Sequence, residues 1–163
     1  MEKVFGATQR HDQLTTYTGT NRAMLIYGFG TEDGQGFDFR HDFDHHPSRE
    51  ELLEVITQHI DAQTDEKILS GFVWNGKNVW LSAENQRNFS EGQRAAMITN
   101  GASLPVTFKI GEDAQRSPVY HEFTTVEELT AFYLEGVAFI NQCLVDGWRE
   151  KDAAREWVEN LEL

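Results

Sequence analysis

The chain has 163 residues, of which 39% are hydrophobic and 12% aromatic, and it carries a formal net charge of −13. This length and composition suit one folded domain and exclude wholesale disorder. The charge repels phosphate backbones and anionic lipid, so we expect neither nucleic-acid nor membrane binding. It serves either solubility, or a basic partner or bound cation. The single cysteine, Cys143, excludes an internal disulfide and a cysteine-rich zinc site. Its apolar neighbours at helical spacing predict a buried side chain rather than a nucleophile.

The N-terminal segment shows no hydrophobic period. Residues 1–21 are rich in Thr, Gln, Asn and Gly, so we expect an irregular arm there. The remainder, residues 22–163, is expected to form a single α+β domain. The N-terminus also lacks the apolar core of a signal peptide, and no apolar run approaches the length of a membrane span. We therefore expect a reducing cytoplasm as the setting, or a particle assembled there.

The first pair of expected strands covers residues 23–29 and 37–43. The second of these alternates apolar and charged residues, which is typical of a half-buried antiparallel strand. Ser48 and Glu51 then have the spacing of a capping box, and this predicts the start of a helix.

The clearest hairpin lies within residues 68–82, around the turn Asn75-Gly76. A two-residue loop would pair Trp74 with Lys77, whereas a four-residue loop would pair Trp74 with Val79. Aromatic and β-branched cross-strand pairs are worth roughly 0.2–1 kcal/mol each, so we prefer the four-residue loop. Phe72, Trp74, Val79 and Leu81 then share one face, and Val73 and Trp80 the other. Apolar residues on both faces predict that the hairpin is covered on both sides; if only one side is buried within the chain, we expect a partner on the other.

A helix is expected over about residues 83–99, with an amide-rich start that either faces solvent or forms a hydrogen-bonded layer. A third hairpin, residues 104–123, precedes the longest helix, which Thr125 opens with another capping box. The apolar stripe of this helix is so wide that it needs burial on more than one side. Gly136 costs about 1 kcal/mol there, which suggests close packing by another element.

Three hairpin-helix units therefore follow one another along the chain. The expected fold class is α+β, with antiparallel sheet packed against helices and a long C-terminal helix.

The best chemical lead is the segment of residues 40–46, whose His and Asp side chains can ligate metals. On a strand, His41 and His45 would share one face, and Asp44 and His46 the other, so the four converge on one divalent ion only if the strand breaks near Asp44. The alternative is a charged strand end that leads into a loop. No catalytic residue and no other cofactor is predicted. The candidate interaction residues are the four tryptophans: Trp74, Trp80, Trp148 and Trp157.

Three stretches carry a resemblance to a known group of proteins: residues 68–72, residues 80–86, and the helix start at residues 125–129. From about Thr64 to Asp152 the chain resembles a family of uncharacterised domains from phage and prophage proteins, often encoded near tail and structural genes. The resemblance implies a non-enzymatic structural or assembly accessory protein. Such a protein would contact phage structural proteins or its own copies, in the host cytoplasm during assembly or in the virion. The alternative function is a metal-binding module or metal-dependent hydrolase that uses residues 41–46.

Overall fold

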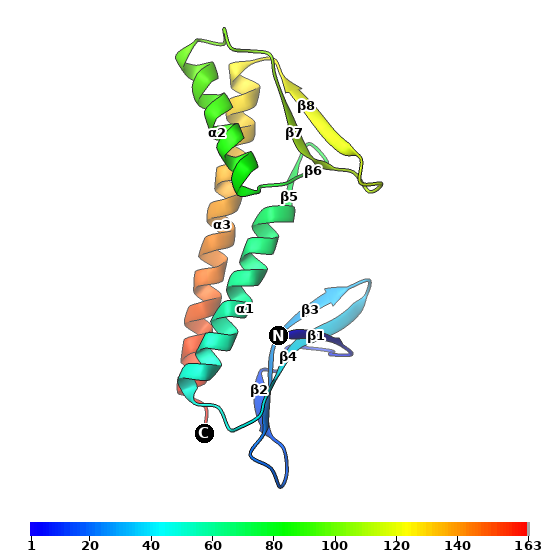
Figure 1. Cartoon of the computed structure of the whole chain (residues 1–163), viewed down its shortest axis with the longest axis vertical. Coiled ribbons are helices and arrows are strands. Elements are labelled where there is room, and N and C mark those ends of the chain that lie inside the picture. Colours follow the sequence, from blue (N-terminus) through cyan, green and yellow to red (C-terminus); the bar gives the residue numbers. More distant parts are fainter. Residues whose placement is uncertain (163) are drawn as a thin grey trace. The chain divides into compact units, whose positions relative to one another are not determined.

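The computed structural model describes residues 1–162, which contain three helices and eight strands (Figure 1). Their bounds are β1 Glu2–Phe5, β2 Gln13–Thr16, β3 Ala23–Glu32, β4 Gln35–Phe43, α1 Arg49–Ser70, β5 Phe72–Trp74, β6 Lys77–Val79, α2 Ala83–Ile98, β7 Val106–Glu112, β8 Pro118–Phe123 and α3 Val126–Glu159. The order of elements confirms the α+β class, the three serial hairpin-helix units and the long C-terminal helix. The strands form three separate antiparallel sheets rather than one.

The chain divides into two compact units rather than one domain with an arm. One unit contains Met1–Asp61 and the chain from Arg149 onward, and the other contains Ala62–Trp148. Both boundaries fall inside helices, α1 and α3. Each unit has its own hydrophobic core.

The first unit contains a four-stranded sheet with strand order β1-β4-β3-β2. Residues 1–21 are therefore not an irregular arm, because they supply both edge strands, β1 on β4 and β2 on β3. Their polar composition hid these strands, since short edge strands are commonly polar. The core residues of the sheet and of the helices are Leu25, Tyr27, Phe43, Leu52, Ile56, Ile60, Ala154 and Val158.

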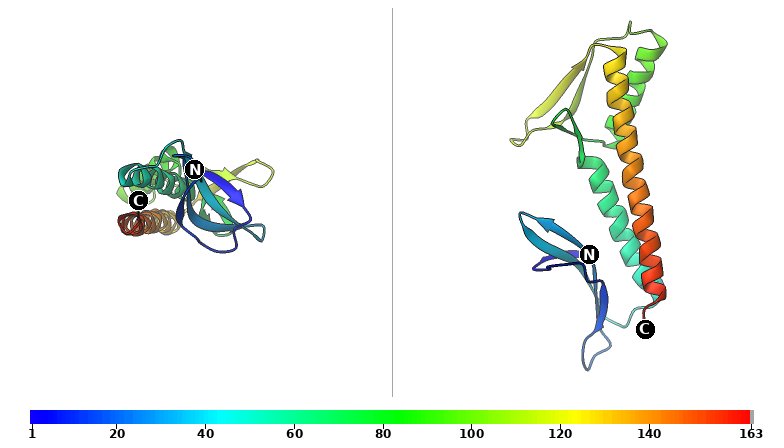
Figure 2. Two further views of the ribbon diagram at one scale, coloured as in Figure 1. Left: turned by 90° about the horizontal axis from the view of Figure 1, so that it is seen from below. Right: turned by 180° about the vertical axis from the view of Figure 1, so that it is seen from behind.

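The second unit is built on two hairpins that lie side by side (Figure 2). The Trp80 N–H of the first hairpin donates to the Ile110 carbonyl of the second at 2.8 Å. Aromatic rings fill the core beneath, with Phe132 of α3 within 5.0 Å of both Trp74 and Phe123, measured between ring centroids. The buried core residues are Phe72, Trp74, Val79, Leu81, Phe89, Ala96, Ile110, Phe123, Leu129 and Phe132.

The register of β5–β6 differs from the one that we preferred from sequence. Trp74 pairs with Lys77 and Phe72 with Val79, so the loop has two residues and the four-residue loop is wrong. Asn75 and Gly76 both have positive φ, 48° and 74°, as a two-residue turn requires. Turn geometry thus outweighed the cross-strand pairs. The predicted inward face is confirmed, because Phe72, Trp74, Val79 and Leu81 are buried.

All three helix starts have side-chain caps, and at α2 the Ser82 hydroxyl accepts the Asn85 N–H at 3.2 Å. The Ser48 N–H donates to Glu51 Oε2 at 2.8 Å, and the Ser48 hydroxyl accepts the Glu51 N–H at 3.3 Å. The Thr125 hydroxyl accepts the Glu128 N–H at 3.2 Å. Each cap satisfies backbone donors that a helix start leaves unpaired. Among the described residues, none of the helices combines the length and apolar character needed to cross a bilayer.

Candidate functional site: a protein-binding face on α3

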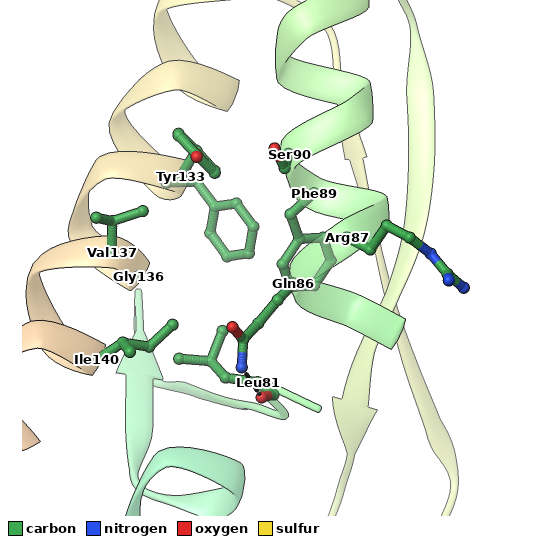
Figure 3. A pocket seen from close by; sticks show the side chains of 10 residues that line it. Leu81, Gln86, Arg87, Phe89, Ser90, Tyr133, Gly136, Val137 and Ile140 are labelled. Atoms are coloured by element: carbon green, nitrogen blue, oxygen red, sulfur yellow. Dashed lines mark hydrogen bonds between the residues drawn. The ribbon is translucent and has the colours of Figure 1, made fainter. Parts of the chain in front are cut away.

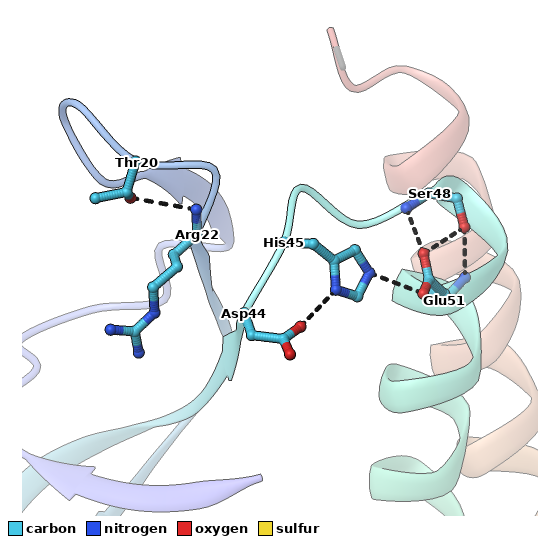
Figure 4. A network of polar contacts seen from close by, with 6 residues as sticks. All are labelled: Thr20, Arg22, Asp44, His45, Ser48 and Glu51. Carbon is cyan, nitrogen blue, oxygen red and sulfur yellow. Dashed lines mark hydrogen bonds and ion pairs between the residues drawn. The ribbon is translucent and has the colours of Figure 1, made fainter.

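The histidine-aspartate segment closes the start of α1 (Figure 4). The Nδ1 of His45 lies 2.7 Å from Asp44 Oδ1, and its Nε2 lies 2.9 Å from Glu51 Oε1. These hydrogen bonds raise the pKa of His45, which favours an imidazolium that donates from both ring nitrogens. Bonds from Ser48 and then from His45 lower the pKa of Glu51 to about 2. A ring whose two nitrogens both donate has no lone pair left for a metal ion.

The other two candidate ligands, His41 and His46, have different surroundings from His45. His41 is half-buried, with its ring 4.7 Å from that of Phe43, and burial lowers its pKa. His46 is exposed. Within residues 1–162, no three His, Cys, Asp or Glu side chains are grouped so that they could hold a metal ion. The metal site stays a prediction, and the geometry fits better with a charged strand end that leads into a capped helix.

The four tryptophans occupy different environments. Trp74 is 5% exposed and belongs to the core of the second unit, and Trp157 packs near Tyr27 in the first unit, with ring centroids 6.1 Å apart. Both therefore stabilise the fold. Trp148 on α3 is 56% exposed and is available to a partner.

Trp80 lies in a polar recess of about 500 Å³ beside the start of α2. The Lys109 ammonium covers its ring, 5.5 Å from the ring centroid. Asn85 Nδ2 donates to the Trp80 carbonyl at 2.8 Å, and Gln86 Nε2 donates to the Leu81 carbonyl at 2.6 Å. Within the amide-rich start of α2, these two side chains bind the segment just before the helix, whereas Glu84, Arg87 and Asn88 are exposed. Each of the two alternatives that the sequence left open therefore holds for part of this stretch.

A largely apolar face of α3, with one polar residue at its centre, is mostly exposed in the second unit. Leu134, Val137 and Trp148 are 57%, 44% and 56% exposed. Asn141 is also exposed, and Leu144 is half-buried. We call these five residues the α3 outer face: Leu134, Val137, Asn141, Leu144 and Trp148. The opposite face of the same helix buries Phe132 and Cys143 within the unit, and burial raises the pKa of the Cys143 thiol. The apolar stripe of α3 is therefore as wide as predicted, but the chain buries it on one side only and not on more than one side.

The α3 outer face is free of charge in a protein that is otherwise strongly acidic. Its five residues are uncharged, and the flanking positions Ala138 and Val145 are uncharged as well. From Ser117 to Trp148 the chain has no Lys or Arg. A contiguous exposed apolar surface without charges is typical of a protein contact site.

A groove adjoins the α3 outer face, between α2 and α3 (Figure 3). Its volume is about 310 Å³, and Val137 belongs both to the groove and to the outer face. Phe89 and Gln86 reach towards the groove from α2 and Ile140 from α3, with Leu81 below them (Figure 3). The size and apolar lining suit one large apolar side chain of a partner.

Two groups of polar contacts were not foreseen from the sequence, and the first of them joins residues far apart in the chain. In the first unit, the Tyr27 hydroxyl donates to Glu150 Oε1 at 2.6 Å, and Arg10 Nη2 donates to the same oxygen at 2.7 Å. Burial opposes ionisation of Glu150, but these hydrogen bonds lower its pKa on balance. In the second unit, His121 Nε2 lies 2.9 Å from Glu128 Oε1 and ties β8 to α3. Both groups of contacts stabilise the packing of elements.

The α3 outer face had a sequence signal that we did not use. Its residues are spaced three, four, three and four apart, which is the spacing of a helix-helix contact seam. The sequence pattern does not separate these residues from the buried ones, because both sets are largely apolar and lie on one helix.

Of three comparisons with known proteins, one finds a match. No curated protein and no solved structure matches the chain. Residues 49–162 match a family described as a domain of unknown function, DUF4376. The match begins at the first residue of α1 and takes in all three helices, whereas β1 to β4 precede it. Because the match covers more than half of the sequence, this chain belongs to the DUF4376 family.

Proposed function

We propose that this protein is a non-enzymatic protein-binding module that serves as a structural or assembly accessory of a phage or prophage. The observation that carries the proposal is the α3 outer face, which exposes Leu134, Val137 and Trp148 without a charge among them. Apolar side chains in contact with water are unfavourable in free energy, and a partner that buries these three side chains would gain that free energy on binding. The phage setting rests on the resemblance of residues 64–152 to phage and prophage domains.

The proposed partners are phage structural proteins or further copies of the chain. A partner would lay an apolar helix or loop on the α3 outer face and insert one side chain into the adjoining groove. The net charge of −13 disfavours nucleic acid and anionic membranes as partners. The protein would meet its partners in the host cytoplasm during assembly or in the virion.

The proposal is tested by following the tagged chain during phage growth. Particles and assembly intermediates are purified, and the chain and the phage structural proteins are quantified in each fraction by mass spectrometry. We expect the chain in particles or in complexes that contain a phage structural protein. A chain that is absent from every such fraction overturns the proposed function.

Two variants connect this result to the α3 outer face. Trp148→Glu places a carboxylate on the face and is expected to reduce co-fractionation at least about tenfold, since a charge buried in an apolar contact is poorly tolerated. Ile98→Glu is the matched control, because Ile98 is 71% exposed on α2 and lies outside the face. Equal losses in both variants would place the contact elsewhere.

A further inference from the structure

The residues of the α3 outer face have the spacing of a helix-helix contact seam, separate from the side of α3 that packs within the chain. With Leu134, Asn141 and Trp148 as the a positions and Val137 and Leu144 as the d positions, the face spans two heptads. Phe139 and Cys143, on the other side of the helix, pack within the chain. The a and d positions are thus left for a helix outside this chain.

Asn141 is the single polar residue at the centre of this seam, and it is exposed. An Asn at one a position loses stability against an aliphatic residue but pairs well with another Asn through hydrogen bonds. In a parallel helix pair each a position faces the same a position of the partner. In an antiparallel pair an a position faces a d position, so Asn141 would face an aliphatic side chain and lose its partner.

The charge of the molecule also restricts what can occupy the seam. A second copy carries the same net charge of −13, so it can approach closely only where carboxylates are absent. The seam meets this condition, because its five residues and the flanking Ala138 and Val145 are uncharged. In a parallel pair, a second copy also places its own Asn141 opposite Asn141, so the two amides can form hydrogen bonds to each other.

We propose that the chain forms a parallel homodimer through the α3 outer face, with Asn141 paired with Asn141 of the second copy. Val137 and Leu144 form the apolar layers on either side of this pair, and Leu134 and Trp148 close the two ends. This inference rests on the proposed protein-binding function and names one partner and one register for it.

The first experiment measures association by sedimentation equilibrium at pH 7 for the full chain and two variants. Asn141→Asp is nearly isosteric but places two carboxylates against each other in the dimer, and it is expected to weaken association at least about tenfold. Gln142→Glu is the matched control, because it makes the same change at an exposed position one residue away, outside the seam. It is expected to leave the dimer intact. Circular dichroism checks that both variants keep the helical content of the native chain.

The second experiment tests the register by oxidative cross-linking. Asn141→Cys is expected to form a disulfide-linked dimer rapidly, since equivalent a positions face each other in a parallel pair. Gln142→Cys is expected to cross-link far more slowly. The native chain controls for Cys143, which is buried.

Either of two results overturns the inference. One is a monomeric native chain at high micromolar concentration, with Asn141→Cys no faster to cross-link than Gln142→Cys. The other is a dimer in which Asn141→Asp and Gln142→Glu behave alike. Both leave the proposed function standing if the chain still co-fractionates with a phage structural protein, so the two failures are distinguishable.

Discussion

His59 and His45 lie in opposite electrostatic environments within the first unit. His59 Nε2 is buried without a hydrogen-bond partner, and its ring centroid lies 4.2 Å from that of Phe39. Burial, and then the positive charge of the N-terminal amino group, lower the pKa of His59 to about 4. His45 instead has a raised pKa, because Asp44 and Glu51 accept its hydrogen bonds. Acid therefore acts on the two histidines in opposite directions.

We expect His59 to make the protein less stable as the pH falls from about 6.5 to about 4. In the unfolded chain this group binds a proton below its ordinary pKa of 6.5, but in the folded chain only near 4. The unfolded state gains the proton first, so the free energy of unfolding falls by about 1–2 kcal/mol across this window, after allowance for solvent screening. Denaturant unfolding of the native chain and of His59→Leu measures this difference. Identical pH profiles for the two proteins would contradict the expectation.

The two hydrogen bonds of His45 lead to an expectation about metals. Zn²⁺ or Ni²⁺ would have to compete with two carboxylates, Asp44 and Glu51, for the ring nitrogens of His45. We therefore expect neither ion to raise the melting temperature at micromolar concentration and pH 7. A rise that disappears in the variant with both His45→Gln and His46→Gln would instead support the metal-binding alternative.

Glycines in the helices of the second unit differ in what surrounds them. A Cβ on Gly136 would lie 3.7 Å from Phe72 Cε1 and 3.8 Å from Leu81 Cδ2, which is ordinary contact. The close packing that we predicted at Gly136 is therefore wrong, and this glycine instead lines the groove. At Gly92 a Cβ would lie 2.5 Å from Phe108 Cζ, so the lack of a side chain there serves the packing of β7 on α2.

These two glycines predict opposite effects of the same substitution. Gly136→Ala is expected to raise the free energy of unfolding by about 1 kcal/mol, because alanine favours the helix and meets no obstacle. Gly92→Ala is expected to lower it by about 1–3 kcal/mol, because Phe89 and Phe123 confine the Phe108 ring. Chemical denaturation measures both variants, and stabilisation by Gly92→Ala would refute the packing argument.

On the scale of the whole molecule, the net charge of −13 opposes both folding and association. Salt shortens the range of this repulsion, with a Debye length of about 30 Å at 0.01 M and about 10 Å at 0.1 M. The α3 outer face holds no ion pair that salt could weaken.

We therefore expect added NaCl to raise the melting temperature and to tighten self-association. Differential scanning calorimetry and sedimentation equilibrium over this range of salt concentration measure the two effects. Association that weakens with salt would indicate a contact between opposite charges, away from the α3 outer face.

Local patterns accounted for much of the fold. Ser48 and Thr125 marked their helix starts, because a capping box depends on residues three positions apart. Alternation along residues 37–43 marked β4, and Asn75-Gly76 marked the tight turn. The polar edge strands β1 and β2 had no such local signal, since pairing with β3 and β4 makes them strands.

The sequence by itself determined the α+β class, the three hairpin-helix units and the width of the apolar stripe on α3, because these depend on neighbours within a few residues. Only the tertiary structure decided which side of that stripe is covered. Phe132 and Cys143 are buried, whereas Leu134, Val137 and Trp148 are exposed. The physical reason is that burial depends on which distant elements pack against a helix. An apolar residue at a helix surface has the same local pattern whether it meets its own core or a partner.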